Sequence, residues 1–84
     1  MRLTDRVKLD EAVALRPERF GALAYSYNDR RLLFIDRALL PFVESGGVRT
    51  VGEIADEDSL GGTQLERILL VLEALKRKGI LRAG

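Results

Sequence analysis

The sequence predicts a small α+β domain in which three short strands precede three helices. Apolar side chains recur with a period of two as far as Ile35, and beyond it the period lengthens toward the 3.6 residues of an α-helix. The chain also has only 84 residues, a size at which one core of two layers is the limit. We therefore expect a small three-stranded antiparallel sheet packed on three helices, in the order βββααα.

The first strand is expected just after a charged N-terminal segment. Residues 1–11 are weakly patterned, so we predict a flexible N-terminal arm there and the folded domain over residues 12–84. Residues 12–15, Ala-Val-Ala-Leu, form a short apolar run. Arg16-Pro17 stops this run, and the proline biases residue 16 toward extended backbone.

The second and third strands are expected to form a hairpin. Residues 20–27 alternate, with Leu23, Tyr25 and Tyr27 on one side and Phe20, Ala22, Ala24 and Ser26 on the other. Asn28-Asp29 then makes a two-residue turn, because both residue types tolerate a positive φ. Residues 30–35, Arg-Arg-Leu-Leu-Phe-Ile, return as the third strand.

A capping residue marks the first helix. Asp36 can cap a helix that runs to Val43 and ends before Gly46-Gly47. Pro41 lies inside this stretch, so it either kinks the helix or moves the start of the helix toward itself.

Two capping boxes open the other helices. Thr50 and Glu53 have the spacing of such a box and begin a short helix that reaches Ala55. Thr63 and Glu66 repeat this spacing and begin the longest helix, which extends to about residue 78. A glycine at position 79 ends it, and residues 80–81 are expected to pack back as a short extended tail.

Composition narrows the classes of function. The 14 basic and 13 acidic residues give a net charge of +1, which provides no general attraction to nucleic acid or to an anionic membrane. No stretch approaches the roughly 18 apolar residues that span a bilayer, and the N-terminus lacks the apolar run of a signal peptide. The chain has no cysteine, which fits a reducing compartment. We expect a cytoplasmic protein that binds neither nucleic acid nor membrane.

No constellation typical of an enzyme is present. The chain has neither histidine nor cysteine, which removes the commonest general base, thiol catalysis and every usual structural zinc ligand set. Glu53, Asp56, Glu57 and Asp58 cluster around a helix end, where solvation is expected rather than a metal site. Gly61-Gly62 is expected to be a plain helix cap, because no phosphate-binding fingerprint surrounds it. We therefore predict no catalytic residue, no metal site and no cofactor.

The long helix carries a candidate binding surface. At about 100° per residue, its core-facing stripe consists of Leu65, Ile68, Leu69, Leu72 and Leu75. Leu70 lies almost opposite this stripe, with Ala74 beside it and Arg67 and Arg77 on its flanks. Two interpretations remain open: a scattered surface leucine, or the wall of an apolar groove with basic edges.

The third strand carries another candidate surface. Arg30-Arg31 precede an unbroken apolar run, residues 32–35, whereas natural proteins usually protect an exposed strand edge with charge, proline or a bulge. At an edge of the sheet this strand could accept an extended peptide as a further strand. In the centre of the sheet the same residues are ordinary core, and the order of the strands along the chain does not decide between the two.

The helical half permits other functions. A short helix, a turn, a longer helix and a return, over residues 50–56, 63–78 and 80–82, is the layout of a winged helix-turn-helix. The basic residues of the long helix, Lys76-Arg77-Lys78, lie at its far end, where they suit the helix dipole. A DNA-binding regulator is thus an alternative with few suitable contacts. A dimerisation module that buries the hairpin edge is a third.

The N-terminal half resembles a known family. Leu15-Arg16-Pro17-Glu18, then Phe20-Gly21-Ala22-Leu23, and then the hairpin strand over residues 31–35 resemble the mycofactocin-system peptide chaperones. These are relatives of the small pyrroloquinoline-quinone chaperones, the PqqD-like recognition elements of ribosomally made peptides. The resemblance continues more loosely over the helices and covers roughly residues 10–83.

The resemblance implies a winged-helix-like βββααα fold and a non-catalytic role. Relatives bind a precursor peptide and deliver it to a radical S-adenosylmethionine maturase, which in this system decarboxylates a C-terminal tyrosine and links it to the preceding valine. The iron–sulfur clusters and S-adenosylmethionine belong to that enzyme, and a chain without cysteine could not hold a cluster. A monomer or a weak homodimer is expected. The implied peptide site is the third strand, Arg31, Leu32, Leu33, Phe34 and Ile35, together with the long helix around Arg67, Leu70, Val71 and Ala74.

Overall fold

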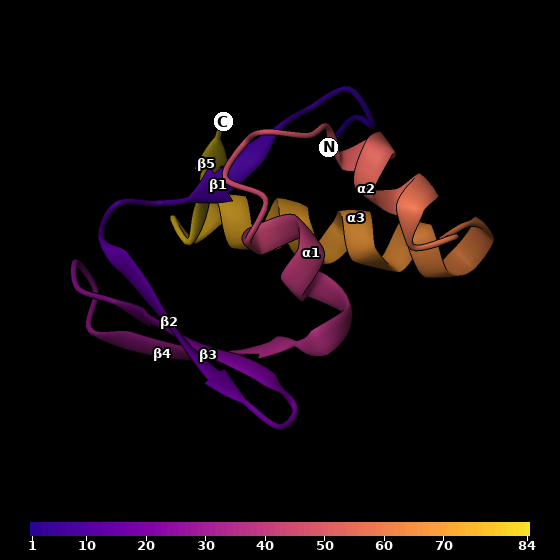
Figure 1. Cartoon of the computed structure of the whole chain (residues 1–84). Helices are drawn as coiled ribbons and strands as arrows, with labels where there is room; N and C mark the ends of the chain where they lie inside the picture. Colours follow the sequence, from indigo (N-terminus) through magenta and orange to yellow (C-terminus); the bar gives the residue numbers. More distant parts are fainter.

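The computed structural model describes all residues 1–84 and has an α+β fold (Figure 1). Its elements in chain order are β1 (Val7–Leu9), β2 (Val13–Glu18), β3 (Gly21–Ser26), β4 (Arg31–Asp36), the 3-10 turn η1 (Arg37–Leu39), α1 (Leu40–Val43), α2 (Val51–Glu57), α3 (Gly62–Arg77) and β5 (Leu81–Ala83). The predicted three-stranded antiparallel sheet and three helices are confirmed. The predicted order βββααα is wrong at both ends, because one strand precedes the sheet and another follows the last helix.

β1 and β5 form a second, two-stranded sheet that joins the two ends of the chain (Figure 1). They are antiparallel, with Val7 opposite Ala83 and Leu9 opposite Leu81. Val7 is 1% exposed and belongs to the core. The structure thus places a paired strand inside residues 1–11, where the sequence predicts an arm. The tail expected at residues 80–81 corresponds to β5.

The N-terminal segment also covers the start of α2. The first amides of a helix have no partner within the helix. Here the Val51 N–H donates to the Asp5 carbonyl at 2.8 Å, and the Gly52 N–H donates to the Leu3 carbonyl at 2.7 Å. Residues 3–5 therefore supply the hydrogen bonds that α2 cannot make by itself.

The larger sheet has the order β2-β3-β4, so β3 is central and both neighbours are edges. β2 runs on through Pro17 to Glu18, three residues beyond the predicted run at residues 12–15. The Tyr27 N–H donates to the Ala12 carbonyl at 2.8 Å, which fixes the alternation of bonded and non-bonded pairs along the hairpin. In this register Pro17, opposite Ala22, is at a non-bonded position on an edge, where its missing N–H costs no ladder bond.

The turns differ in detail from the prediction. β3 ends at Ser26 and β4 begins at Arg31, so the turn expected at Asn28-Asp29 is the centre of a four-residue connection. Gly21 has a φ of 147°, and a Cβ there would clash with the carbonyl oxygen of Ile35, so only glycine fits. The alternation predicted that Phe20 shares a face with Ala22. In the structure it does not, and its ring contacts Phe34 instead, because the unusual backbone at Gly21 interrupts the period of two.

The first helix is shorter than predicted. Asp36 is a cap, as expected, and accepts a hydrogen bond from the Ala38 N–H at 2.9 Å, but it caps the 3-10 turn η1. The α-helix itself begins at Leu40, with Pro41 in its first turn. Of the two alternatives for Pro41, the later start is therefore correct, because proline is tolerated where the helix needs no N–H donor.

The two predicted capping boxes have different outcomes. At α2 the box is complete: the Glu53 N–H donates to Thr50 Oγ1 at 3.1 Å, and the Thr50 N–H donates to Glu53 Oε1 at 2.9 Å. At α3 the prediction is wrong, since Gly61 is the N-cap and the helix begins at Gly62, before Thr63. Gly61-Gly62 thus forms the cap of this helix, as expected.

The core lies between one face of the larger sheet and the helices, and the opposite face is open (Figure 1). Phe42, Ile54 and Ile80 are among its fully buried side chains. The predicted stripe of α3 is confirmed. Its buried members are Ile68, Leu72 and Leu75, and its half-buried members, packed against the core, are Leu65 and Leu69. No buried side-chain nitrogen or oxygen lacks a hydrogen-bond partner. None of the helices has the length and apolarity needed to cross a membrane.

Candidate functional site

β4 is an edge strand, which decides between the two interpretations of the apolar run. The Arg37 N–H donates to the Phe20 carbonyl at 3.0 Å and sets the alternation of the β3–β4 ladder. Leu33 and Ile35 therefore use their backbone groups within the sheet. Leu32 and Phe34 point their N–H and C=O groups outward from the free edge, where a further strand can pair.

The side chains of β4 divide between the two faces of the sheet. Ile35 is 1% exposed and Leu33 is half-buried, so both face the core. Leu32 and Phe34 are 63% and 78% exposed and lie on the open face. Arg31 is exposed at the start of the strand, with its Nε 3.8 Å from Asp29 Oδ2. The strand thus offers its backbone at the edge and its apolar side chains on a separate surface.

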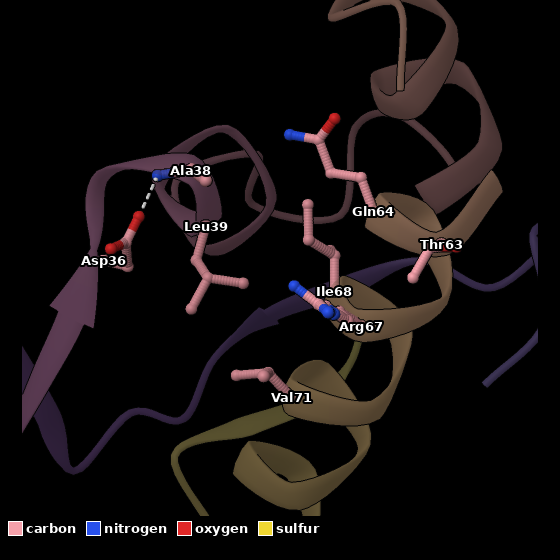
Figure 2. Close-up of a pocket in the computed structure, with 8 residues that line it drawn as sticks. All are labelled: Asp36, Ala38, Leu39, Thr63, Gln64, Arg67, Ile68 and Val71. Atoms are coloured by element: carbon pink, nitrogen blue, oxygen red, sulfur yellow. Dashed lines mark hydrogen bonds between the residues drawn. The ribbon is translucent and has the colours of Figure 1, made fainter. Parts of the chain in front are cut away.

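A cavity of about 700 Å³ adjoins the end of this edge and separates it from α3 (Figure 2). Arg67 and Val71 point from α3 toward the side on which Leu39 of η1 lies, and Ile68 lines the cavity beside them (Figure 2). This volume is in the usual range for small-ligand pockets and is sufficient for one or two peptide side chains. The complete lining is Asp36, Ala38, Leu39, Thr63, Gln64, Arg67, Ile68 and Val71.

The polar groups of the cavity are mostly free to bind a ligand. Arg67 is exposed and takes part in none of the five ion pairs of the protein. The Asp36 carboxylate, in contrast, is engaged by the Ala38 N–H. The wall formed by α3 therefore carries a free positive charge next to the apolar side chains of Ile68 and Val71. Such a wall suits a ligand that combines an apolar group with a carboxylate.

The predicted residues of α3 are only partly brought together. Arg67 and Val71 line the cavity, and Ala74 continues their stripe at helical spacing as a half-buried residue. Leu70 is 71% exposed and lines a different, shallow hollow of about 410 Å³ on the neighbouring side of the helix. Met1, Glu66, Leu69 and Glu73 complete that hollow. Leu70 is therefore at the outer shoulder of the cavity and not inside it.

Six lining residues were not predicted as part of the site: Asp36, Ala38, Leu39, Thr63, Gln64 and Ile68. Ile68 was assigned to the core, where it is indeed buried, and it also forms part of the cavity wall. The others come from the end of β4 with the adjoining η1 and from the first turn of α3. No sequence signal relates these two segments, because their approach depends on how the 3-10 turn packs.

The acidic cluster is a structural feature of α2. Glu53 belongs to the capping box, and the hydrogen bonds from the backbone and side chain of Thr50 lower the pKa of its carboxyl group from the ordinary value of 4.5. Glu57 forms an ion pair with Arg49. No three carboxylates converge in a way that could hold a metal ion.

Comparison with known proteins adds a family to this geometry. A family model described as the peptide chaperone MftB family matches residues 6–82, from just before β1 into β5. The match includes β4, α3 and the cavity that lies beside them. No curated protein and no solved structure matches the chain.

Proposed function

The chain belongs to the peptide chaperone MftB family, and on this basis we propose that it binds a ribosomally made precursor peptide and presents it to a radical S-adenosylmethionine maturase of mycofactocin biosynthesis. In this proposal the chain is non-catalytic and holds no cofactor. It acts in the cytoplasm as a monomer or weak homodimer, and its fold has the winged-helix-like character that the resemblance implies. The single observation that supports a peptide as the ligand is the free edge of β4 beside the cavity.

The peptide would add to β4 as a further strand. Leu32 and Phe34 present four backbone groups along the free edge, two N–H donors and two C=O acceptors. These bonds contribute affinity without selecting a sequence, because every residue except proline offers the same backbone N–H and C=O groups. The edge therefore accounts for binding of an extended chain, and selectivity must come from elsewhere.

Selectivity would come from α3 and the cavity. A side chain of the docked peptide that enters the cavity meets Val71 and Ile68, and an acidic group beside it can pair with Arg67. Ala74 leaves space for the peptide farther along the helix, and Leu70 extends the apolar wall at the shoulder. The proposed site thus comprises β4, where Leu32 and Phe34 present the outward backbone groups and Arg31, Leu33 and Ile35 hold the strand in the sheet. On α3 it comprises Arg67, Leu70, Val71 and Ala74.

The DNA-binding alternative is not favoured by any observation. Arg67 is the only basic residue of α3 before its last turn, whereas DNA readers place several polar or basic side chains early in the recognition helix. A gel-shift measurement at two salt concentrations tests this directly, since phosphate-driven binding must weaken steeply as salt increases.

Calorimetry with a mycofactocin precursor peptide tests the proposal. We expect saturable binding with a Kd on the order of micromolar, and Arg67→Gln should weaken it about tenfold by removing the free charge of the cavity. Lys76→Gln is the matched control, because it removes a positive charge from the same helix outside the cavity. Absence of binding by the parent protein at high micromolar concentration would contradict the proposed function. Equal effects of the two substitutions would remove the cavity from the site.

A further inference from the structure

The open face of the larger sheet carries an apolar patch whose side chains the proposed peptide site does not use. Its members are Phe20, Leu23, Tyr25, Tyr27, Leu32 and Phe34, contributed by β3, β4 and the two connecting turns. Phe34 is 78% exposed, and Tyr27 and Leu32 are each more than 60% exposed. Six neighbouring apolar side chains on one open face are unusual for a protein that acts alone, because contiguous exposed patches generally mark interaction sites.

The patch is ordered by contacts among its own members. The rings of Phe20 and Phe34 meet edge to face with centroids 5.2 Å apart, and those of Tyr25 and Tyr27 do the same at 4.8 Å. A hollow of about 270 Å³ is lined by residues of β2, β3 and β4, among them Leu23, Tyr25 and Leu32 of the open face. Tyr25 is the one ring that lines this hollow, and clustered aromatic side chains are frequent among binding hot spots.

The rim of the patch is basic. Arg16 lines the hollow and is paired with Glu18 at 2.9 Å. Arg19 lies beside Phe20 in the first turn, and Arg37 reaches this turn through a hydrogen bond to the Arg19 carbonyl. Arg30 lies at the other end, close to Tyr27 in sequence. Arg19, Arg30 and Arg37 form no ion pair with any carboxylate of the protein.

This charge distribution selects between possible occupants. A second copy of the chain would bring unpaired arginines against unpaired arginines in either antiparallel or parallel orientation, and such like-charge contacts are costly. A different protein whose apolar surface is bordered by carboxylates would pair with the same arginines. The geometry points to a folded, acidic-rimmed partner and not to self-association.

We propose that the open sheet face is where the peptide-modifying enzyme docks, while the peptide occupies the β4 edge and the cavity. This assignment rests on the proposed function for the identity of the partner. The two surfaces are continuous, because Leu32 and Phe34 give their backbone to the edge and their side chains to the open face. A peptide strand added to β4 would extend the open face with its own alternate side chains, so an enzyme seated there would contact chaperone and peptide together.

Binding measurements with a radical S-adenosylmethionine maturase of mycofactocin biosynthesis test this assignment. Phe34→Glu and Tyr27→Glu should each weaken enzyme binding at least about tenfold, since both place a charge in the patch. Val48→Glu is the matched control, because Val48 is 75% exposed in the loop before α2, and it should change enzyme binding by less than about twofold. Tyr27 lies outside β4, so Tyr27→Glu should leave peptide affinity unchanged. Enzyme and peptide should also raise each other's affinity by the same factor.

The outcomes separate this inference from the proposed function. Folded Phe34→Glu and Tyr27→Glu variants that both bind the enzyme like the parent protein would overturn the docking surface, whatever the peptide does. Sedimentation that shows a parent dimer dissociated by Phe34→Glu, with enzyme binding unchanged, would overturn it in favour of a second copy. Loss of enzyme binding in both variants would support it even if the parent failed to bind the peptide, in which case only the peptide proposal falls.

Discussion

Adjacent residues of β4 serve different surfaces. The side chain of Ile35 is buried in the core, whereas that of Phe34 is on the open face. The backbone N–H and C=O groups of Phe34 point outward from the free edge. The period of two in a strand makes this division unavoidable, because neighbouring side chains must point to opposite faces. A predicted site that assigns all five β4 residues to one ligand therefore combines three roles: core packing, backbone pairing and open-face contact.

At the scale of single residues, Leu70 provides the simplest test of the peptide site. Its 71% exposure means that Leu70→Glu should leave the melting temperature nearly unchanged. We expect the same substitution to weaken peptide binding about tenfold, or about 1.4 kcal/mol, because it places a carboxylate on the apolar shoulder of the cavity. Calorimetry and thermal melting measure the two quantities on one sample. A folded variant with the parent affinity would exclude Leu70 and leave the cavity with Arg67 and Val71 alone.

Helical spacing predicted that Leu70 is exposed, but it did not predict which element lies across the cavity from α3. The stripe that contains Leu72 fixes which side of α3 faces the core, so the opposite side is known from the sequence. The element that lies across from Val71 is not known from the sequence, because Leu39 belongs to a 3-10 turn that no local pattern predicted. The local pattern could therefore identify one wall of the site and not the other.

At the scale of elements, the register of β4 makes Leu32 and Leu33 unequal. The Leu32 amide faces outward and the Leu33 amide bonds to β3. We expect Leu32→Pro to abolish one peptide hydrogen bond while retaining the fold, because proline is tolerated at outward positions of edge strands. Leu33→Pro should instead lower the melting temperature markedly by removing a ladder bond. Melting curves and peptide titrations of both variants provide the comparison.

Leu32→Ala is the control for this pair, because it shortens the same exposed side chain and keeps the N–H group. Peptide binding by Leu32→Pro that equals binding by Leu32→Ala would show that no strand docks on this edge.

The capping box of α2 makes the stability of the protein depend on pH. Hydrogen bonds from Thr50 lower the pKa of Glu53 in the folded protein, so the ionised carboxylate contributes stability above its unfolded pKa of about 4.5. This contribution is lost as the pH falls through the lower, folded value. We expect the difference in stability between the parent and Glu53→Ala to be largest near neutral pH and to shrink below about pH 4.5. Urea unfolding at several pH values measures it.

Thr50→Ala should cost about 0.5–2 kcal/mol at neutral pH, the usual effect of removing an N-cap side chain. Thr63→Ala is the matched control, because Thr63 has the same predicted role but does not cap α3. A difference between parent and Glu53→Ala that stays constant with pH would contradict the role of the carboxylate.

The capping signals show where sequence prediction of elements succeeds. Thr50 caps α2 because the helix begins at the next residue, Val51, and because the reciprocal bonds with Glu53 are local. Thr63 has the same spacing to Glu66, but Gly61-Gly62 allows the backbone to enter the helix earlier. Local chemistry therefore predicted that a helix starts in both places and placed only one of the two starts correctly.

At the scale of the whole molecule, the pairing of β1 with β5 joins the ends of the chain. Three residues per strand are too few to leave a recognisable alternation, and the partners are separated by almost the full length of the sequence. Nothing local in residues 1–11 indicates a strand, because the partner that makes it one is distant. The sequence predicts a flexible arm over residues 1–11. In the structure this segment contains a core residue, Val7, and the carbonyl groups that accept hydrogen bonds from the first amides of α2.

Val7 measures how much the fold depends on this segment. Its side chain is 1% exposed, so Val7→Ala removes buried methyl groups and should cost about 2 kcal/mol, which lowers the melting temperature by about 10 °C in a domain of this size. Leu3→Ala, at a side chain that is 47% exposed, should cost no more than about 0.5 kcal/mol. Amide exchange provides an independent measure, since the Val51 and Gly52 protons bonded to Asp5 and Leu3 should exchange slowly. Fast exchange at both amides with an unchanged melting temperature in Val7→Ala would mean that residues 1–11 behave as the flexible arm that the sequence predicts.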